Sequence, residues 1–502
     1  MKKLKELLSD TLVYGISSVV ARFLNYLLVP FYTDVFDPSS YGIVGLVYSA
    51  IAFLHVLFTF GMESAYLRYG AKREQSKHVF KTLQLTLLGG ATLLVFGLWL
   101  LRPVALPMIG LDNGPSSIYL MMLGILWFDA MGIVPFAELR LVRRSWLFSG
   151  LKVMNVAINL VLNFYLVLAQ GWGIEAVFAS NLIASATTTL LLWGLTARQL
   201  AGEFNQLITR RALAFGLPFV PTGIAYAVNE FIDRFFLNSM THFNVTRIYG
   251  ADFTAEAVVG VYNACYKLAV FMLLFIQMFR MAWQPFFLRH AEDEHAPKLF
   301  SHAFTYFNMI AAVLFLGISL FAEQIVAIRI PILDVTLIGE QYWMGLHIVP
   351  FLLLAYWFQG WYVNFTAGIF IREKTGRLPQ VTLVGAAVTI AANYFMVPRY
   401  GMSGAAFSTV ASYAVMAIMI YVYSQRSYPV PYQIIRTGMM MATGVGLVLA
   451  APYLIKQLGN PLMVRAGLLV GGLIITGALG FSKTPLFITN RKGYESPDNN
   501  DS

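Results

Sequence analysis

The stretch ALAFGLPFVPTGIAYAVNEFIDRFFLN, residues 212–238, sets the class of fold. A helix needs about 20 mostly apolar residues to cross the hydrocarbon core of a bilayer, and this stretch is longer than that. Its charged residues are Glu230, Asp233 and Arg234. A charge near the bilayer centre costs at least ~2.5–3.5 kcal/mol, so charged side chains in a span face protein or water. The stretch therefore predicts a transmembrane helix that buries ionisable groups.

The whole chain has the composition of a membrane protein. Of its 502 residues 58% are hydrophobic and 12% are charged, and the mean hydropathy is +0.66, whereas soluble domains carry roughly 25% charged residues. The single cysteine, Cys265, excludes an intramolecular disulfide and a multi-cysteine metal site. Apolar runs of membrane-spanning length recur about fourteen times. They are 11–34, 42–64, 80–101, 117–138, 147–169, 173–196, 212–238, 257–284, 300–321, 342–366, 378–397, 402–423, 432–455 and 461–481.

Lysine and arginine are concentrated in alternate loops. With the N-terminus in the cytoplasm, each inside segment holds at least two of these residues, and each outside segment holds none or one. The positive-inside rule therefore predicts that both termini are cytoplasmic. The same arrangement accounts for the net charge of +10, so no nucleic acid partner is expected.

The chain repeats itself across six spans. Residues 163–167 (NFYLV) resemble residues 393–397 (NYFMV), and each group is followed by a glycine turn, at Gly171 and at Gly401, and by a helix rich in small residues. Because six crossings return the chain to the same side, the two halves form a parallel repeat. The basic linker Thr196–Arg211 ends the first half.

We therefore expect an all-α polytopic membrane protein with about fourteen transmembrane helices. Two six-helix bundles would surround a central cavity, and two C-terminal helices would be an addition. The expected divisions are 1–200 for the first bundle, 201–430 for the second, 431–482 for the added pair and 483–502 for a polar cytoplasmic tail.

Motifs near the start of the second half resemble a known family. They are residues 217–221 (LPFVP), 229–237 (NEFIDRFFL), 259–268 (VGVYNACYKL) and 283–287 (WQPFF). In the first half, residues 30–33 (PFYT), 41–42 and 60–62 resemble the matching part. On these motifs the chain resembles the O-antigen (Wzx-like) polysaccharide flippases of the multidrug/oligosaccharidyl-lipid/polysaccharide (MOP) exporter superfamily.

This resemblance implies a flippase that serves surface polysaccharide biosynthesis. Such a protein moves undecaprenyl-pyrophosphate-linked oligosaccharides from the cytoplasmic to the periplasmic leaflet of the bacterial inner membrane by alternating access. The expected partners are this cargo, membrane lipids and other polysaccharide-assembly proteins, and a monomer is sufficient. No cofactor and no enzymatic activity are expected. A gradient of H⁺ or Na⁺, or the membrane potential, would drive transport.

Cations within the spans are the candidate contacts for the pyrophosphate, because phosphate attracts arginine and lysine. Arg22 and Lys267 lie near the middle of their spans, too far from either end to snorkel easily to the interface. Asn263 lies one helical turn before Lys267 and shares its face. One such cation in each half suits a cavity between two bundles. An ion pair between Arg22 and Asp129 is the alternative.

Polar residues nearer the cytoplasmic ends are further candidates for binding substrate. Arg280 and Lys152 either line an inner mouth or snorkel to the interface. Lys152 belongs to a stripe with Asn155, Asn159 and Asn163, which recur every four residues. Lipid would not tolerate such a stripe, so it either lines the cavity or forms interhelical hydrogen bonds. A sixth cation, Arg465, is expected at the outer interface.

Carboxylates within the spans are the candidates for ion coupling. Asp129, Glu230 and Asp233 could each bind H⁺ or Na⁺. Pairing with Arg22 or Arg234 competes with this hypothesis. Arg234 lies one turn from Glu230, which favours a helix ion pair between them over a contact with substrate.

Three rival functions remain open. A peptidoglycan-precursor (lipid II) flippase would recognise the same pyrophosphate. A MATE-like cation-coupled multidrug antiporter would prefer a cavity dominated by carboxylates. A membrane glycosyltransferase, polymerase or ligase would need a catalytic outer loop, whereas the longest outer segments here are only about 239–256 and 322–341. No phosphate-binding glycine loop ending in Gly-Lys-Ser/Thr is present, so direct use of ATP is not expected.

Overall fold

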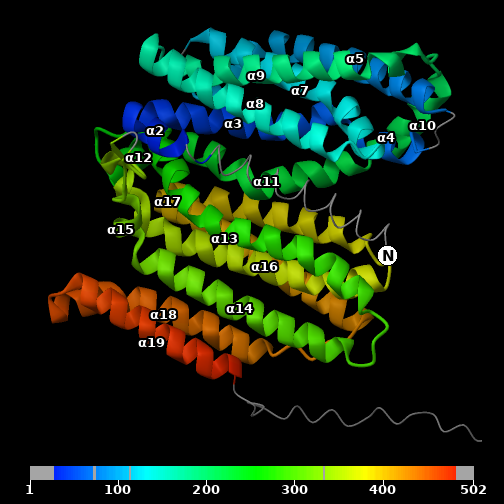
Figure 1. The fold of residues 1–502 in the computed structure, drawn as a ribbon. Coiled ribbons are helices and arrows are strands. Elements are labelled where there is room, and N and C mark those ends of the chain that lie inside the picture. The colour runs from blue at the N-terminus through cyan, green and yellow to red at the C-terminus, as the bar shows by residue number, and fades with distance from the viewer. Residues whose placement is uncertain (1–25, 27, 72–74, 112–114, 332–333, 482–502) are drawn as a thin grey trace, which may run out of the picture. The chain divides into compact units, whose positions relative to one another are not determined.

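The computed structural model describes residue 26 and residues 28–71, 75–111, 115–331 and 334–481. Nearly all of these residues are helical, which confirms the predicted all-α class (Figure 1). Within the described part of the chain, the two strands β1 (Arg329–Ile330) and β2 (Val335–Thr336) form one short antiparallel ladder. The predicted first span, 11–34, and with it Arg22, lies mostly outside the described residues.

The helices follow the predicted spans closely. Those of the first half are α2 (Leu28–Val35), α3 (Pro38–Thr59), α4 (Met62–Tyr69), α5 (Ser76–Leu100), α6 (Arg102–Met108), α7 (Ser116–Leu141), α8 (Ser145–Phe164), η2 (Tyr165–Ala169), α9 (Glu175–Thr196) and η3 (Ala197–Ala201). Those of the second half are α10 (Gln206–Gly216), α11 (Phe219–Asn238), α12 (His242–Tyr249), α13 (Ala255–Arg289), α14 (Ala296–Leu320), α15 (Ala322–Val326), η4 (Glu340–Ile348), α16 (Val349–Ile371) and α17 (Arg377–Ser427). Two more follow, α18 (Ile434–Leu458) and α19 (Pro461–Phe481).

The described residues contain 11 helices that are long and apolar enough to cross a membrane, or 12 if the bent pair α10 and α11 is one span. The protein is therefore a multi-pass membrane protein. The predicted number of fourteen spans is not confirmed. Part of the difference comes from α17, whose 51 residues cover both predicted spans 378–397 and 402–423.

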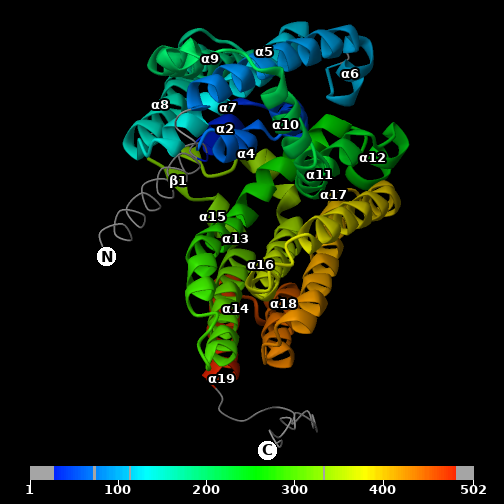
Figure 2. The same cartoon turned by 90° about the vertical axis from the view of Figure 1, so that its right-hand side faces the viewer.

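α17 reverses its direction at Gly401, where φ is 55° and ψ is −129°. Ser412 Oγ on the second arm donates a hydrogen bond to the Gly385 carbonyl oxygen on the first arm at 3.0 Å, so the two arms run antiparallel (Figure 2). α12 holds this turn, because the Met402 amide donates to the Tyr249 hydroxyl oxygen at 2.7 Å. Burial raises the pKa of Tyr249 to about 12, which keeps the phenol neutral. The tight hairpin predicted here is thus confirmed.

The two matching segments of the sequence repeat share two local features. Asn163 and Asn393 are both 0% exposed, and each donates its side-chain amide to the carbonyl oxygen four residues earlier at 2.8 Å. Each then leads to a glycine with positive φ, 67° at Gly171 and 55° at Gly401. Such backbone favours glycine because a Cβ would be strained there. The matched positions support the predicted repeat.

α3 and α13 cross with their backbones in contact. Asp37 caps α3 by accepting hydrogen bonds from the backbone of Ser39 and Ser40, which starts the helix beside the first turn of α13. A Cβ on Gly42 would lie 1.8 Å from the Glu256 carbonyl oxygen, and a Cβ on Gly260 would lie 1.9 Å from that of Pro38. Small residues at helix crossings permit such an approach. The two halves therefore meet at a point where only glycine fits.

The helices group into two compact units. One combines the described residues up to Ala291 with Phe321–Pro429, and the other combines Glu292–Leu320 with the described residues from Val430. In the second unit α14 packs on both α18 and α19, and Ser301 Oγ donates to the Pro431 carbonyl oxygen at 2.6 Å. The division at residues 200, 430 and 482 drawn from the repeat stays a prediction.

We expect Gly401→Ala to destabilise the protein. A non-glycine residue in such a sparsely populated backbone conformation costs about 1–3 kcal/mol, and the new Cβ would lie 2.0 Å from the Tyr249 hydroxyl oxygen. Thermal unfolding in detergent, followed by size-exclusion chromatography, measures the effect. Gly376→Ala at the start of the same helix is the control, because no atom lies within 4 Å of its Cβ. Equal stability of the two variants would refute the role of this turn.

Candidate functional site

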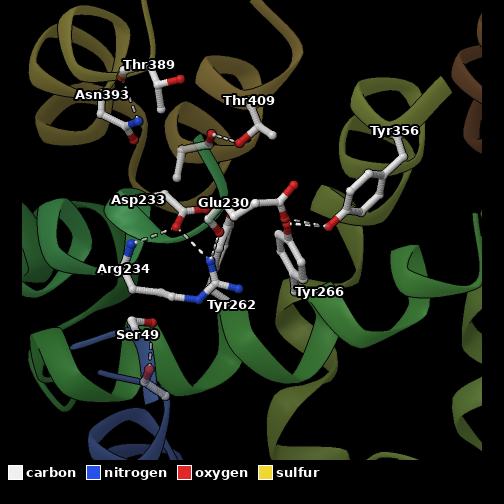
Figure 3. A network of polar contacts seen from close by, with 12 residues as sticks. Ser49, Glu230, Asp233, Arg234, Tyr262, Tyr266, Tyr356, Thr389, Asn393 and Thr409 are labelled. Atoms are coloured by element: carbon white, nitrogen blue, oxygen red, sulfur yellow. Dashed lines mark hydrogen bonds and ion pairs between the residues drawn. The ribbon is translucent and has the colours of Figure 1, made fainter. Parts of the chain in front are cut away.

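α11 carries three ionisable side chains into the interior of the protein. Glu230, Asp233 and Arg234 are 6%, 3% and 4% exposed. Asp233 and Arg234 lie about one helical turn after Glu230, on the same side of α11. Their partners come from α13, α16 and α17, which surround this face (Figure 3). A buried polar cluster therefore occupies the centre of the second half.

Arg234 is neutralised within this cluster. Its guanidinium donates to Asp233 Oδ1 at 2.8 Å and to the Glu230 backbone carbonyl oxygen at 2.8 Å. Arg234 thus forms an ion pair within its own helix, as predicted, but the predicted partner, Glu230, was wrong. The ion pair is with Asp233, and Glu230 accepts a hydrogen bond from Arg234 only through its backbone. The adjacent side chain can bend back to the guanidinium, while the side chain of Glu230 points to α16 and α17 (Figure 3).

Two tyrosines of α13 complete the surroundings of Arg234. The Tyr262 hydroxyl donates to Asp233 Oδ2 at 2.5 Å. The guanidinium lies 5.6 Å from the centre of the Tyr262 ring and 4.5 Å from that of Tyr266, distances at which a cation is attracted to an aromatic face. Charge, hydrogen bonds and ring faces together hold this arginine in place. Its charge is therefore not available to an anionic ligand in this conformation.

Glu230 has no cationic side chain as a partner in the described part of the chain. Its carboxylate accepts a hydrogen bond from the Tyr413 hydroxyl of α17. Two longer contacts come from α16, with the Tyr356 hydroxyl at 3.4 Å and Gln359 Nε2 at 3.5 Å. The Tyr356 hydroxyl also lies 2.6 Å from that of Tyr266. A buried carboxylate held by neutral donors is a group that can take up a proton.

Lys267 is a predicted cation that has no carboxylate partner among the described residues. It lies on α13, is half-buried, and forms no ion pair with any carboxylate of the described residues. Its ammonium lies 5.9 Å from the centre of the Tyr26 ring. Both side chains line a pocket of about 60 Å³. The other lining residues are Val29, Pro30, Leu268, Val270, Phe271, Leu274, Leu337 and Ile338.

Asn263 does not share that pocket. Its side chain is 7% exposed and packs against Gly45 of α3, so a Cβ on that glycine would lie 3.2 Å from Asn263 Nδ2. Asn263 and Lys267 lie one helical turn apart on α13, but they contact different parts of the protein. Asn263 lies at the crossing of the two halves, and only a separation of α3 from α13 would free it for a ligand.

The predicted asparagine stripe of α8 is used in hydrogen bonds between and within helices. Asn155 Nδ2 donates to Thr188 Oγ1 of α9 at 3.0 Å. Asn163 Nδ2 donates to Asn159 Oδ1 at 2.9 Å, while Tyr32 of α2 donates to Asn163 Oδ1 at 2.7 Å. These contacts favour the structural alternative for the stripe in this conformation.

Lys152 and Asp129 belong to a second, looser group of charges in the first half. Lys152 is exposed, and its ammonium lies 4.2 Å from the centre of the Phe136 ring. Asp129 of α7 interacts with the Ser185 hydroxyl of α9 and with the charges of His55 and Lys152. The predicted partner of Asp129, Arg22, lies outside the described residues. Arg280 is exposed on α13, apart from the buried cluster.

Sequence reasoning found the charged members of the cluster but missed the tyrosines. Tyr262 and Tyr266 are four residues apart on the helix that carries Lys267, so helical spacing could have indicated them. Tyr356 and Tyr413 contact Glu230 across separations of 126 and 183 residues, which no local pattern predicts. No group of His, Cys, Asp and Glu arranged to hold a metal ion occurs within the described residues.

We expect Asp233→Asn to destabilise the protein strongly. The change leaves a buried guanidinium without its counter-charge, and breaking a buried ion pair in this way costs about 3–5 kcal/mol. Asp334→Asn is the matched control, because its ion pair with Arg329 has side chains 86% and 74% exposed, and exposed pairs contribute little. Thermal unfolding in detergent compares the two. A similar effect of both changes would contradict the importance of the buried pair.

Several solved structures have a similar fold. A structure described as "Lipid II flippase MurJ, inward closed conformation" is similar with a TM-score of 0.71 and 11% identity, over 93% of this chain and 98% of that chain. An inward-facing multidrug resistance MATE family transporter of the MOP superfamily is similar with a TM-score of 0.61 and 17% identity, over 80% and 93%. A point mutant of the Vibrio cholerae MATE transporter VcmN gives 0.55 and 14%, over 84% and 96%.

These similarities show that the fold is that of MOP transporters and flippases. At such low identity they say nothing about cargo. No curated protein sequence matches the chain. The family described as "Polysaccharide biosynthesis protein" matches residues 7–291, more than half of the sequence and including the cluster on α11 and α13. The chain therefore belongs to the polysaccharide biosynthesis protein family.

Proposed function

We propose that the protein flips undecaprenyl-pyrophosphate-linked oligosaccharide repeat units from the cytoplasmic to the periplasmic leaflet of the bacterial inner membrane. The proposal is supported by the family, by the MOP fold and by one observation in particular: Lys267, which no carboxylate of the described residues pairs with, lies at a pocket lined otherwise mainly by apolar side chains. A lysine attracts phosphate as a point charge. An apolar wall suits the prenyl chain next to that phosphate.

The size of the pocket supports transport by alternating access. A volume of about 60 Å³ holds only a few water molecules and is far too small for an oligosaccharide. Cargo can enter only if the segments around Lys267, which are α2, α13 and residues 337–338, separate. In the proposed cycle Arg22, Asn263, Lys152, Asn155, Asn159 and Arg280 contact the cargo in the open states.

The proposed orientation, oligomeric state and partners of the protein rest on its charge distribution and its cargo. Both termini lie in the cytoplasm, where lysine and arginine are concentrated. A monomer suffices, because one chain supplies both halves. Membrane lipids and other polysaccharide-assembly proteins are the proposed partners. The protein acts as a transporter, without a cofactor.

We expect Lys267→Ala and Arg22→Ala each to reduce surface polysaccharide in a flippase-deficient strain by roughly ten- to hundredfold. A hydrogen bond to a charged group contributes about 1.5–3 kcal/mol, which corresponds to that loss. Lys267→Arg should retain much of the activity, because the positive charge remains. Lys456→Ala, at an exposed lysine of α18, is the control. Surface glycan is measured at matched protein levels in the membrane.

Other outcomes would favour the rival functions. Normal glycan from both alanine variants would contradict the cationic site. Rescue of cells depleted of their lipid II flippase, without any surface glycan, would favour the peptidoglycan precursor as cargo. Drug resistance on overexpression without a glycan phenotype would favour a cation-coupled multidrug antiporter.

We propose further that Glu230 takes up the coupling proton. Of the three candidate carboxylates, Asp233 is paired with Arg234, and Asp129 interacts with Ser185, His55 and Lys152. The donors that Glu230 meets among the described side chains are hydroxyls and an amide. A Na⁺ site would require several free oxygen ligands, whereas Arg234 already occupies Asp233 Oδ1 and the Glu230 carbonyl oxygen. These contacts favour H⁺ over Na⁺.

We expect Glu230→Gln to abolish cargo accumulation driven by a pH gradient in proteoliposomes, while exchange of cargo without a gradient continues. Glutamine keeps the size of the side chain and can still accept a hydrogen bond from Tyr413, but it cannot bind a proton. Imposed H⁺ and Na⁺ gradients are compared in the parent and the variant. If the pH gradient still drives accumulation in the variant, or only the Na⁺ gradient drives it in the parent, Glu230 is not the coupling group.

A further inference from the structure

The linker between the two predicted halves is bound to the first half. Glu138 of α7 is 3% exposed. It accepts hydrogen bonds from the Tyr66 hydroxyl of α4 at 2.6 Å and from Gln199 Nε2 of η3 at 2.8 Å. A buried carboxylate with two donors is costly to separate from them. The beginning of the linker is thus fastened to helices that precede it.

The middle of the linker lies against α5. The Glu203 amide donates to His78 Nδ1 at 2.9 Å, and the Asn205 amide donates to Thr82 Oγ1 at 3.0 Å. A Cβ on Gly202 would lie 2.3 Å from the carbonyl carbon of Lys77. Side chains of the first half therefore satisfy the linker's backbone donors, and the backbones touch.

α10, the inner part of the predicted seventh span, continues this attachment. It packs on α4 and α5. Thr209 Oγ1 lies 3.2 Å from Thr86 Oγ1 of α5, and the Arg68 guanidinium lies 4.5 Å from the centre of the Phe215 ring. At its end, a Cβ on Gly216 would lie 2.3 Å from the Phe60 carbonyl oxygen. Although the sequence repeat assigns α10 to the second half, its contacts hold it to the first.

The packing changes at the break that follows. α10 and α11 meet at an angle of 41°, and α11 packs extensively on α17 of the second half as well as on α3. Pro218 and Pro221 have no amide hydrogen, so two hydrogen bonds of the helix ladder cannot form there. Sharp helix bends commonly arise at such prolines. The part of the chain between the two halves that bends most easily therefore lies inside the span, not in the linker.

We propose that residues 197–216 move with the first half, and that the hinge between the halves is the segment 217–221. This proposal rests on the proposed rocking transport, and it names the element about which the rocking occurs. The linker is then a rigid extension of the first bundle. The motion is taken up by a few backbone angles around Pro218 and Pro221, as is usual for hinges.

Two engineered disulfides test the proposal in the full chain. Thr86→Cys with Thr209→Cys joins α5 to α10. Ser39→Cys with Thr254→Cys joins the first turns of α3 and α13, where the two hydroxyl oxygens lie 3.0 Å apart. The native Cys265 is 0% exposed and does not interfere. Purified protein in liposomes is given a polyprenyl-pyrophosphate-linked oligosaccharide, and cargo reaching the opposite leaflet is captured with a lectin, before and after reduction.

We expect the oxidised Thr86/Thr209 pair to transport within about twofold of its reduced form, because both residues belong to one body. The oxidised Ser39/Thr254 pair should lose at least about tenfold and recover on reduction. Loss of transport on oxidation of the Thr86/Thr209 pair would overturn the proposed hinge. Failure of the reduced proteins to move this cargo would instead count against the proposed function.

A distance measurement gives a second test that does not depend on transport. Spin labels are placed in pairs on Leu207 with Leu195, and on Leu207 with Leu288, all of them exposed positions. On addition of the same cargo, the first distance should stay constant and the second should shift. A shift of the first distance, or no shift of either, would contradict a hinge at 217–221.

Discussion

Glycine at the contact points of α3 allows the two halves of the chain to meet backbone to backbone. Gly42 of α3 faces the first turn of α13, and on α13 a Cβ at Gly260 would lie only 1.9 Å from the Pro38 carbonyl oxygen. Lipid gives no hydrophobic driving force for helices to associate, so close packing has to hold them together. The packing of Asn263 against Gly45 depends on this close approach.

The charged side chains of the second half differ in the partners that they have, and therefore in the roles that they can take. Arg234 directs its charge to Asp233 and to the rings of α13, and it organises the cluster without being available to a ligand. Lys267 forms no ion pair with a described carboxylate and lines a mainly apolar pocket. Glu230 keeps a carboxylate that forms no ion pair with a cation among the described side chains. Two neighbouring helices thus carry a structural ion pair, a candidate cargo contact and a candidate proton carrier.

Local sequence signals predicted the features that depend on local physics. Hydrophobic runs predicted most helices, and the glycines at 171 and 401 predicted both tight turns, because a positive φ requires a residue without a Cβ. Partners distant in sequence could not be predicted: nothing near Glu230 indicates Tyr413. Helical spacing indicated the wrong partner for Arg234, since a neighbouring aspartate can also reach the guanidinium. The packing of α10 on the first half could not be predicted from the repeat. A repeat shows which spans correspond to one another in sequence, whereas the contacts decide which spans move together.

The clamp between α12 and the turn of α17 also bears on how the chain is assembled. Tyr249 and Met402 are 153 residues apart, so during synthesis the loop that carries Tyr249 is complete long before its partner leaves the ribosome. The turn at Gly401 then meets a ready acceptor for the amide of Met402 as the second arm of α17 enters the membrane. The residue that accepts this hydrogen bond is thus synthesised well before the residue that donates it.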